Sequence, residues 1–544
     1  MFIFVERSVL TAMLPVLLLL TAVILLACIL LNRVSGKLGI PMLLAFILLG
    51  MFFGSDGVVK IPFENYAAAE SICSAALILI MFYGGFGTKW SQARPAALKA
   101  GVLSTLGVAA TAGLTGLFCH FVLGMPLLEG LLLGAVTGST DAASVFSILR
   151  SKRLNLKYHT APLLEVESGS NDPCSYMLTA IVLMMMEGSA QGGALVWMLF
   201  SQVFFGVLFG FLTAWAALWV LGRFRFSDGF DTIFVLAAAL LSYAVPALLG
   251  GNGYLSAYIA GIILGNRPLK NKAALVHFFD GVTGLMQMLI FFLLGLLAFP
   301  SQLPRLMVPA LLTALFLTFV ARPAAVFLLL APSRCPARQC ALVSWAGLRG
   351  AASIVFAILA TVSPAVISYD IFHFVFCIVI FSILLQGSLL PLVARKLDMI
   401  DEGGDVLKTF NDYQEEVPVQ FIRFTVPEGH PWSGKAVREI TLPPGTLLVQ
   451  LRRGEALIAP RGDALLQAGD RLILSASAPE ESDGIRLTEL HLEEGHEWVG
   501  KTLADLPLEG DKLVIMVQRR GSVLIPTGRT VLEPGDTLVI NQGE

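Results

Sequence analysis

The chain has 544 residues, of which 56% are hydrophobic and 14% are charged, and its formal net charge is −2. This composition excludes an ordinary soluble protein, because many apolar runs exceed the roughly eighteen residues that suffice to cross a bilayer. We therefore expect a polytopic membrane protein that has the lipid bilayer as its partner. We expect no nucleic-acid partner, no cofactor and no enzymatic activity.

The near-neutral net charge conceals two different kinds of sequence. Residues 1–396 contain 23 Lys and Arg against 14 Asp and Glu, whereas residues 397–544 contain 14 against 25. All seven cysteines lie in the first part, and none belongs to a Cys-x-x-Cys pair. This spacing favours neither a disulfide framework nor a zinc site, so we interpret most of the cysteines as small apolar packing residues.

The apolar runs of residues 1–396 predict an all-α membrane domain with thirteen transmembrane helices. The first run follows Glu6 and Arg7 and has no small-residue cleavage signal, so we expect a retained helix rather than a signal peptide. The expected spans cover residues 7–32, 38–54, 68–87, 96–122, 127–150, 160–186, 193–222, 229–249, 252–266, 274–298, 305–331, 338–363 and 370–396.

The orientation follows from the Lys and Arg residues of the short loops. Eighteen of them fall on one side of the membrane, and only Arg7, Lys60 and Arg305 fall on the other. Because positively charged loops stay in the cytoplasm, the pattern predicts an external amino terminus and a cytoplasmic carboxy-terminal tail.

A weak internal similarity appears at an offset of about 211 residues. Residues 39–47 align with 251–259, and residues 79–84 align with 290–295. The matched spans have opposite orientations, so the pattern predicts two inverted six-helix repeats, which are typical of alternating-access carriers. At the same offset the fifth expected span aligns with the twelfth. Gly, Ser and Thr residues interrupt both spans near the expected middle of the bilayer. We expect two broken crossing helices whose ends face a central site.

Ionisable residues inside these apolar spans are the candidate functional groups. Asp172 lies near the middle of its span, where desolvation favours the protonated acid, as a proton carrier requires. Its structural alternative is an acid neutralised by a nearby base. Asp141 interrupts the fifth span beside Thr140, where oxygen atoms would suit an alkali cation; its alternative is a helix cap.

Arg349 reaches a depth similar to that of Asp172, and an unpaired arginine would be costly there. Glu167 is its natural partner, so we expect Glu167 and Arg349 to form a structural ion pair that braces the two repeats. Gln287 is expected to be a hydrogen-bond partner, whereas Arg322 and Asp280 lie nearer the ends of their spans and are expected to be interfacial.

The tail is expected to begin with a linker over residues 397–420. Beyond it, residues 430–435 recur as 496–501 and residues 467–474 recur as 533–540, a period near 66. Short alternating apolar runs and Gly, Pro and Asp turns predict two small β-rich modules, at 421–480 and 485–544, in an overall α/β tail. No Gly-x-Gly-x-x-Gly follows a strand, so a Rossmann nucleotide site is not supported.

Three segments carry a resemblance to a known family: residues 138–149, 167–173 and 347–351. They resemble the signature segments of the CPA1 cation:proton antiporters, and the chain is most similar to the NhaP/CvrA-type potassium/proton antiporters with a TrkA-C (RCK-C) tail. The resemblance implies a homodimer with a dimerisation domain and a core domain, and elevator-like exchange.

The resemblance also implies roles for individual residues. Asp172 resembles the acid that binds the cation and the proton in turn, and Asn171 resembles its partner in the Asn-Asp pair of electroneutral exchangers. Ala142 after Thr-Asp and Pro173 after Asn-Asp resemble the potassium-linked subgroup. The remaining residues that match the family pattern are the supporting cation ligands Thr140, Asp141 and Ser168, and the structural pair Glu167 and Arg349.

The sequence thus predicts an electroneutral K⁺/H⁺ antiporter of the bacterial inner membrane, with Na⁺/H⁺ exchange as the alternative within the same fold. A cation channel regulated by the tail is a more distant alternative, because no Thr-Val-Gly-Tyr-Gly filter is present. An intramembrane hydrolase would need a Gly-x-Ser-x-Gly elbow, which is also absent. The tail is expected either to bind a small cytoplasmic ligand or only to stabilise the dimer.

Overall fold

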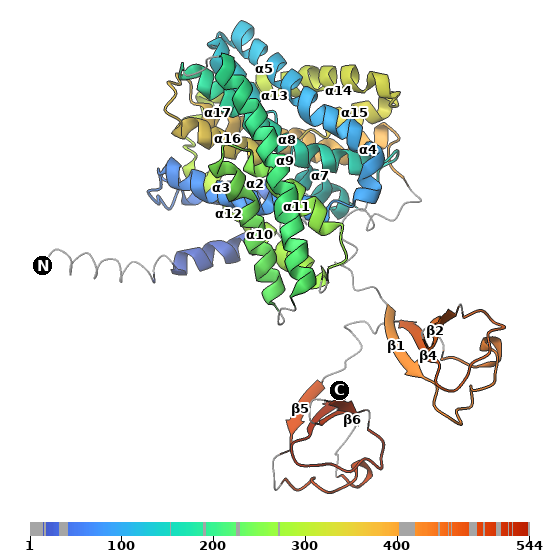
Figure 1. Cartoon of the computed structure of the whole chain (residues 1–544). Helices are drawn as coiled ribbons and strands as arrows, with labels where there is room; N and C mark the ends of the chain where they lie inside the picture. The colour runs from blue at the N-terminus through green and yellow to red at the C-terminus, as the bar shows by residue number, and fades with distance from the viewer. Residues whose placement is uncertain are drawn as a thin grey trace, which may run out of the picture. The chain divides into compact units, whose positions relative to one another are not determined.

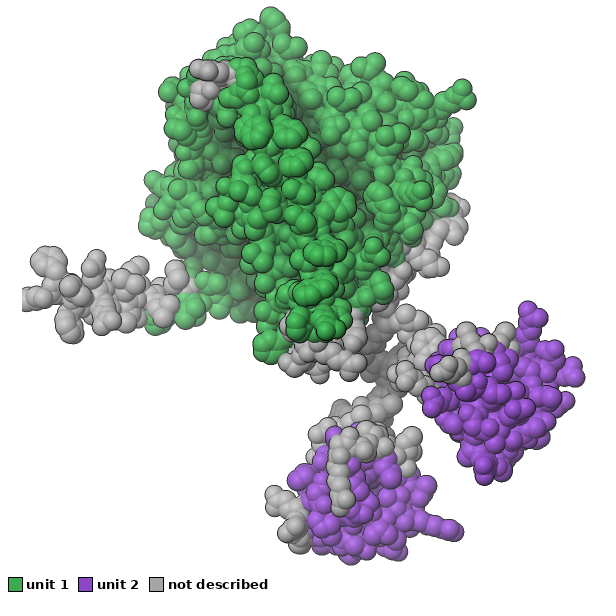
Figure 2. All heavy atoms as spheres, in the orientation of Figure 1, with its two compact units in different colours: residues 1–414 green, residues 415–544 purple. Residues whose placement is uncertain are grey.

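The architecture was analysed in a computed structural model that divides the chain into two units, residues 1–414 and 415–544 (Figure 2). The described residues are 15, 18–31, 42–152, 154–188, 192–224, 229–269, 272–401, 419–443, 446–454, 456–458, 460–477, 487–492, 496–506, 513–519, 522–524 and 526–541. Most of the expected linker therefore lies outside the described residues.

The first unit is built of apolar helices, because backbone polar groups in lipid must be satisfied within each segment. Its described helices are Leu18–Leu31, α2 (Met42–Phe53), α3 (Tyr66–Gly87), α4 (Trp90–Val102), α5 (Val108–Leu123), α6 (Leu127–Val136), α7 (Ala142–Ser151), α8 (Thr160–Met186), α9 (Gly192–Arg223), α10 (Phe230–Leu248), α11 (Gly253–Gly265), α12 (Lys272–Leu297), α13 (Leu303–Phe316), α14 (Arg322–Leu330), α15 (Ala337–Trp345), α16 (Ala351–Val362), α17 (Ile371–Phe381) and α18 (Ser388–Lys396) (Figure 1).

Three pairs of these helices are continuous through a π-helical turn: α4 with α5, α13 with α14, and α17 with α18. Within the described residues, seven helices are long and apolar enough to cross a membrane, and five apolar helices are shorter. This establishes a multi-pass membrane protein. The count of thirteen spans and the inverted repeat stay predictions.

Two helices are interrupted where the sequence predicts breaks. The fifth expected span is divided into α6 and α7 by residues 137–141, and the twelfth into α15 and α16 by residues 346–350. The two interruptions touch, because the backbone N–H of Asp141 donates to the carbonyl of Leu348 at 2.8 Å. Each break therefore supplies a hydrogen-bond partner to the other in the apolar interior.

Glycines allow some of the surrounding helices to approach backbone to backbone. A Cβ at Gly295 of α12 would lie 2.1 Å from the carbonyl oxygen of Ile47 on α2, and a Cβ at Gly261 of α11 would lie 2.1 Å from that of Phe82 on α3. Such contacts between small residues are a principal source of helix association in membranes. Helices α2, α3, α11 and α12 are thereby packed together on one side of the site.

The tail consists of two four-stranded antiparallel sheets with orders β1-β4-β2-β3 and β5-β8-β6-β7. Its described residues contain strands and short 3-10 turns, so the helical part of the expected α/β tail is not seen in them. The strands are β1 (Val419–Thr425), β2 (Leu447–Arg453), β3 (Ala456–Ile458), β4 (Arg471–Ser477), β5 (Leu487–His491), β6 (Leu513–Arg519), β7 (Ser522–Leu524) and β8 (Thr537–Asn541).

Each sheet carries one buried aspartate paired with an arginine at equivalent positions of the duplication. Arg453 contacts Asp470 at 2.8 Å, and Arg519 contacts Asp536 at 2.8 Å. The Arg453 guanidinium lowers the pKa of Asp470 below its ordinary value. The pair therefore stabilises the module above the ordinary aspartate range, and this stabilisation is lost as the pH falls through the lowered pKa.

Candidate functional site

Asp172 lies in the first half of α8, beside the break between α6 and α7. Its side chain is only 9% exposed, and its Oδ1 accepts a hydrogen bond from the hydroxyl of Ser139. The next residue, Pro173, has no N–H to donate to the carbonyl four residues earlier, although α8 continues past it. A carboxyl group is thus held in the protein interior by a hydroxyl from a non-helical segment.

The other α8 residues expected at the site hold the broken segment in place. The Asn171 side-chain amide donates to the Thr140 hydroxyl at 2.6 Å. The Ser168 hydroxyl donates to the Thr140 carbonyl at 2.7 Å and accepts from the Ala142 backbone N–H at 3.0 Å. The predicted set Thr140, Asp141, Ser168, Asn171 and Asp172 is therefore brought together at one place.

Asp141 is held by the helix that follows it. Its carboxylate accepts from the backbone N–H of Ser144 at 3.1 Å and from the hydroxyl of Ser144 at 2.5 Å. This is the N-cap arrangement that the sequence offers as the alternative role for Asp141. Gly350 lies against the same carboxylate, because a Cβ there would come within 2.2 Å of Asp141 Oδ2.

The predicted direct ion pair between Glu167 and Arg349 is wrong. Glu167 forms its ion pair with Arg322 of α14, and both side chains are almost fully buried. Arg322 was expected to be interfacial, and this expectation is wrong as well. Nine residues separate Arg322 from the end of its expected span, and this depth is the signal that could have identified it.

Arg349 instead stabilises the break that follows α6. Its Nη1 donates to the carbonyls of Gly138 and Ser139, both at 2.8 Å, and its backbone N–H donates to the Ser382 hydroxyl at 2.9 Å. The carbonyl end of a helix carries partial negative charge and lacks intrahelical donors. The buried Arg349 guanidinium therefore donates to carbonyls that lack intrahelical donors, rather than to a carboxylate.

A cavity of about 390 Å³ reaches these residues. Ser139, Thr140, Asp141, Ser168 and Asp172 line it. Its exposed lining includes Asp280, near the start of α12, which accepts from the Tyr83 hydroxyl at 3.3 Å. Asp280 is exposed, which agrees with the expected interfacial position, and it lines the cavity as well.

Of two further residues that line the cavity, the sequence analysis singled out one and missed the other. Gln287, expected to be a hydrogen-bond partner, lines the wall formed by α12. Glu165 was not anticipated, although it precedes Asp172 by seven residues and Ser168 by three. That spacing places all three on one face of α8 and is the signal that could have found Glu165.

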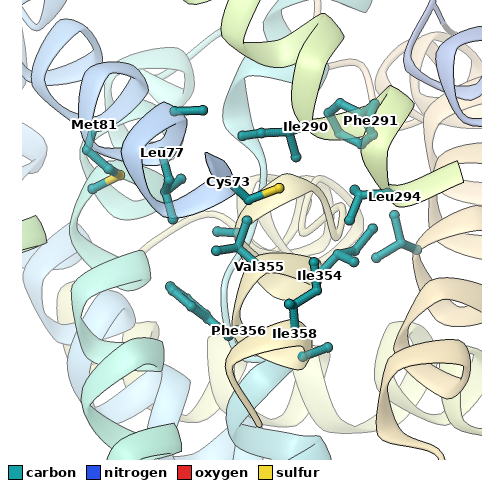
Figure 3. Close-up of a cluster of buried hydrophobic side chains, with 14 of the residues drawn as sticks. Cys73, Leu77, Met81, Ile290, Phe291, Leu294, Ile354, Val355, Phe356 and Ile358 are labelled. Atoms are coloured by element: carbon teal, nitrogen blue, oxygen red, sulfur yellow. The ribbon is translucent and has the colours of Figure 1, made fainter. Parts of the chain in front are cut away.

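A cluster of buried apolar side chains, shown in Figure 3, shares residues with the cavity wall. Leu77 and Phe291 belong to both the cavity wall and this cluster. Its labelled members come from α3, α12 and α16, and we name them the apolar seal: Cys73, Leu77, Met81, Ile290, Phe291, Leu294, Ile354, Val355, Phe356 and Ile358. The candidate site is therefore bordered by apolar side chains of these three helices.

Comparison with known proteins places these features in a family context. The family model described as "Sodium/hydrogen exchanger, transmembrane" matches residues 21–396, and the TrkA-C domain model matches residues 421–482 and 487–540. Similar curated proteins include the K(+)/H(+) antiporter NhaP2 of Shewanella oneidensis, 34% identical over 450 residues that cover 82% of this chain and 78% of the relative.

The K(+)/H(+) antiporter NhaP of Alkalimonas amylolytica is also 34% identical, over 455 residues that cover 83% of this chain and 79% of the relative. A solved structure, that of the sodium proton antiporter MjNhaP1 from Methanocaldococcus jannaschii at pH 8, is 25% identical. It matches with a TM-score of 0.61 and covers 70% of this chain and 99% of the solved one.

The buried ion pair between Glu167 and Arg322 can be tested by a double-mutant cycle. We expect Glu167→Ala and Arg322→Ala each to lower the free energy of unfolding by about 3–5 kcal/mol, because each leaves a buried charge without its partner. The double variant should lose less than the sum of the two, as thermal unfolding of the purified protein would measure. A second cycle with Glu167→Ala and Arg349→Ala measures the coupling between Glu167 and Arg349 for comparison. Stronger coupling of Glu167 to Arg349 than to Arg322 would contradict the pairing.

Proposed function

We propose, since the chain belongs to the sodium/hydrogen exchanger family, that it exchanges K⁺ for protons across the inner membrane of a bacterium. The observation that carries the proposal is the position of Asp172. Its carboxyl group is buried, accepts a hydrogen bond from Ser139 and lines the cavity. Because the carboxylate can bind either a proton or a cation, the two ions compete for one site.

The groups around Asp172 support cation binding without a resident metal. The broken segment contributes the hydroxyls of Ser139 and Thr140, and α8 contributes that of Ser168. Neutral oxygen atoms beside the Asp172 carboxylate suit a weakly hydrated monovalent cation. Asp141 adds negative charge, while Ser144 keeps its carboxylate oriented as a helix cap. In this proposal Asp172 carries the exchanged ion, and Asp141 and Asn171 keep its surroundings in place.

The preference for K⁺ rests on the relatives. Those with the higher identity are named K(+)/H(+) antiporters. Exchange of Na⁺ for protons is the second candidate, favoured by the sodium proton antiporter of known structure and by a probable Na(+)/H(+) antiporter of the same archaeon, 26% identical over 346 residues. The chemistry at Asp172 would be the same for either cation.

Alternating access is supported by the combination of a cavity and a seal. The cavity wall includes the last turns of α3, which lead to Lys89, and Asp280 and Thr283 in the half of α12 that begins at Lys272. The sequence places its positive loops on this side. We propose that this side is cytoplasmic, with the amino terminus outside and the tail inside. The apolar seal then separates Asp172 from the outside, which favours a carrier over a channel.

The remaining architecture is proposed from the family. Thirteen spans in two inverted repeats would place the two breaks at a pseudo-symmetry axis, and the contact between Asp141 and Leu348 agrees with such an arrangement. We propose a homodimer in which a core domain containing α6–α8 and α15–α16 moves against a dimerisation domain. Glu167, Arg322 and Arg349 would keep the core domain rigid during that movement.

Replacement of Asp172 tests the transport site. In proteoliposomes, we expect Asp172→Asn to abolish cation-driven proton movement, because the amide cannot alternate between a proton and a cation. The assay should be run separately with K⁺, Na⁺ and Li⁺, and we expect the wild type to respond best to K⁺. Asp231→Asn, in the first turn of α10 and outside the cavity, is the matched control and should remain active. Proton-coupled transport by the Asp172→Asn variant would refute the assignment.

The stoichiometry provides a second test. One carboxyl group that carries either one proton or one monovalent cation moves no net charge per cycle, so exchange should be electroneutral. We expect no transport current when the ion gradient alone drives exchange across a supported membrane, and no response of the rate to an imposed potential. A current that depends on active protein would exclude one-for-one exchange.

We propose that the tail regulates transport, because the candidate site is complete within the first unit. A ligand of the tail would act by binding one conformation of the transporter better than the other. Deletion of residues 404–544 should therefore shift the pH profile or the apparent cation affinity of exchange. An unchanged profile with only a less stable dimer would instead support a purely structural tail.

A further inference from the structure

A pair of cysteines occupies the start of α15, outside the candidate transport site. Cys335 is half-buried and Cys340 is buried, and the two are the closest cysteines in the sequence. Helix α15 begins at Ala337 with Pro336 as its N-cap, and the Cys340 N–H donates to the Pro336 carbonyl at 3.0 Å. Cys335 thus precedes the cap by one residue, and Cys340 is the fourth residue of the helix.

These two positions are those at which a hydrophobic staple forms. In a staple, the side chain before the N-cap packs against the side chain of the fourth helical residue and determines how the chain enters the helix. The structure agrees, because the Cys335 side chain packs against the buried apolar cluster that contains Cys340. Both side chains of the staple are free thiols.

The first turn of α15 also anchors neighbouring elements. The Gln339 side-chain amide donates to the Tyr158 carbonyl at 3.1 Å and to the Thr160 hydroxyl at 3.3 Å, at the start of α8. Arg338 and Lys157 both contact Asp398, each at 2.9 Å. The staple therefore lies where α8, α15 and the end of α18 meet.

The other end of α15 leads into the transport site. The helix is nine residues long, and the segment after it contributes the Leu348 carbonyl and the Arg349 side chain to the breaks. A short rigid helix transmits a displacement of its first turn to its last. The staple lies at the first turn of α15, and the second break follows its last turn.

We propose that Cys335 and Cys340 form a reversible intramolecular disulfide that slows exchange. The oxidant is a peroxide: the half-buried Cys335 thiolate attacks one peroxide oxygen, which forms a sulfenic acid and releases hydroxide. The Cys340 thiol then attacks the Cys335 sulfur, forms the S–S bond and releases water. Two thiols are oxidised and one peroxide is reduced to water, and a cytoplasmic thiol reductant reverses the step.

The expected consequence follows from the position of the bond. A disulfide would fix the entry of the chain into α15 in one geometry and, through that helix, shift the Leu348 carbonyl and the Arg349 side chain at the breaks. We expect hydrogen peroxide to lower the exchange rate about fivefold, at the lower end of typical coupling between sites. Dithiothreitol should restore the original rate.

The experiment uses the full chain in proteoliposomes, with and without hydrogen peroxide, and has two readouts. Trypsin cleaves after Arg338, between the two cysteines, so the disulfide would join two tryptic peptides, Cys335–Arg338 and Gln339–Arg349, which mass spectrometry detects. This readout does not depend on antiport. The exchange rate, which rests on the proposed function, is measured in the same samples.

The variant Cys335→Val keeps an apolar staple but cannot form the bond, so it should exchange normally and resist peroxide. Cys340→Ala provides a second peroxide-resistant variant. Cys377→Ala is the matched control on another helix and should remain sensitive. Absence of the joined peptides in peroxide-treated wild type would overturn the proposal, as would equal inhibition of wild type and Cys335→Val. Joined peptides with an unchanged exchange rate would overturn the regulatory part.

Discussion

The arrangement of the transport domain depends on one constraint, which is that two broken helices meet where water does not satisfy their backbone groups. Arg349 donates to the exposed carbonyls after α6, and the Asp141 N–H donates to the Leu348 carbonyl. Ser168 bonds both sides of the first break from α8. These hydrogen bonds stabilise the two breaks, and they shape the site as a consequence.

The same network distinguishes the carboxylates that have structural partners from Asp172, the candidate for ion exchange. Asp141 is engaged by Ser144, and Glu167 is engaged by Arg322, so both carboxylates have structural partners. Asp172 has one side-chain partner in Ser139 and borders the cavity. A short hydroxyl contact can be replaced by a cation or by a proton at small structural cost, which suits a group that must alternate.

The elements around the site are connected over longer distances by stiff helices. Helix α8 links the loop near Tyr158 to Asp172, and α15 links the cysteine staple to the second break. Both helices begin at the same cluster of contacts around Asp398 and Gln339. The tail is built on different principles, because each of its small sheets is held around a buried aspartate paired with an arginine.

The sequence by itself determined the membrane class and the positions of both breaks, and it identified Asp172 as a candidate for the transport site. A charge or a Gly-Ser-Thr cluster inside a long apolar run is costly, and it is therefore visible without any knowledge of neighbours. The extent of α8 was likewise readable, since its expected span 160–186 coincides with Thr160–Met186. The duplication of the tail was visible as a repeat of about 66 residues, which β2 and β6 reproduce.

Only the tertiary structure decided which buried charges meet. Arg322 and Arg349 both lie inside apolar spans, and spacing along the chain does not tell which of them faces Glu167. That choice depends on how α14 and the second break pack against α8. It also depends on the carbonyls that follow α6, because Arg349 donates its hydrogen bonds to them rather than to Glu167. The place of Glu165 in the cavity wall and the meeting of Cys335 with Cys340 were decided in the same way, by helix packing and by where α15 begins.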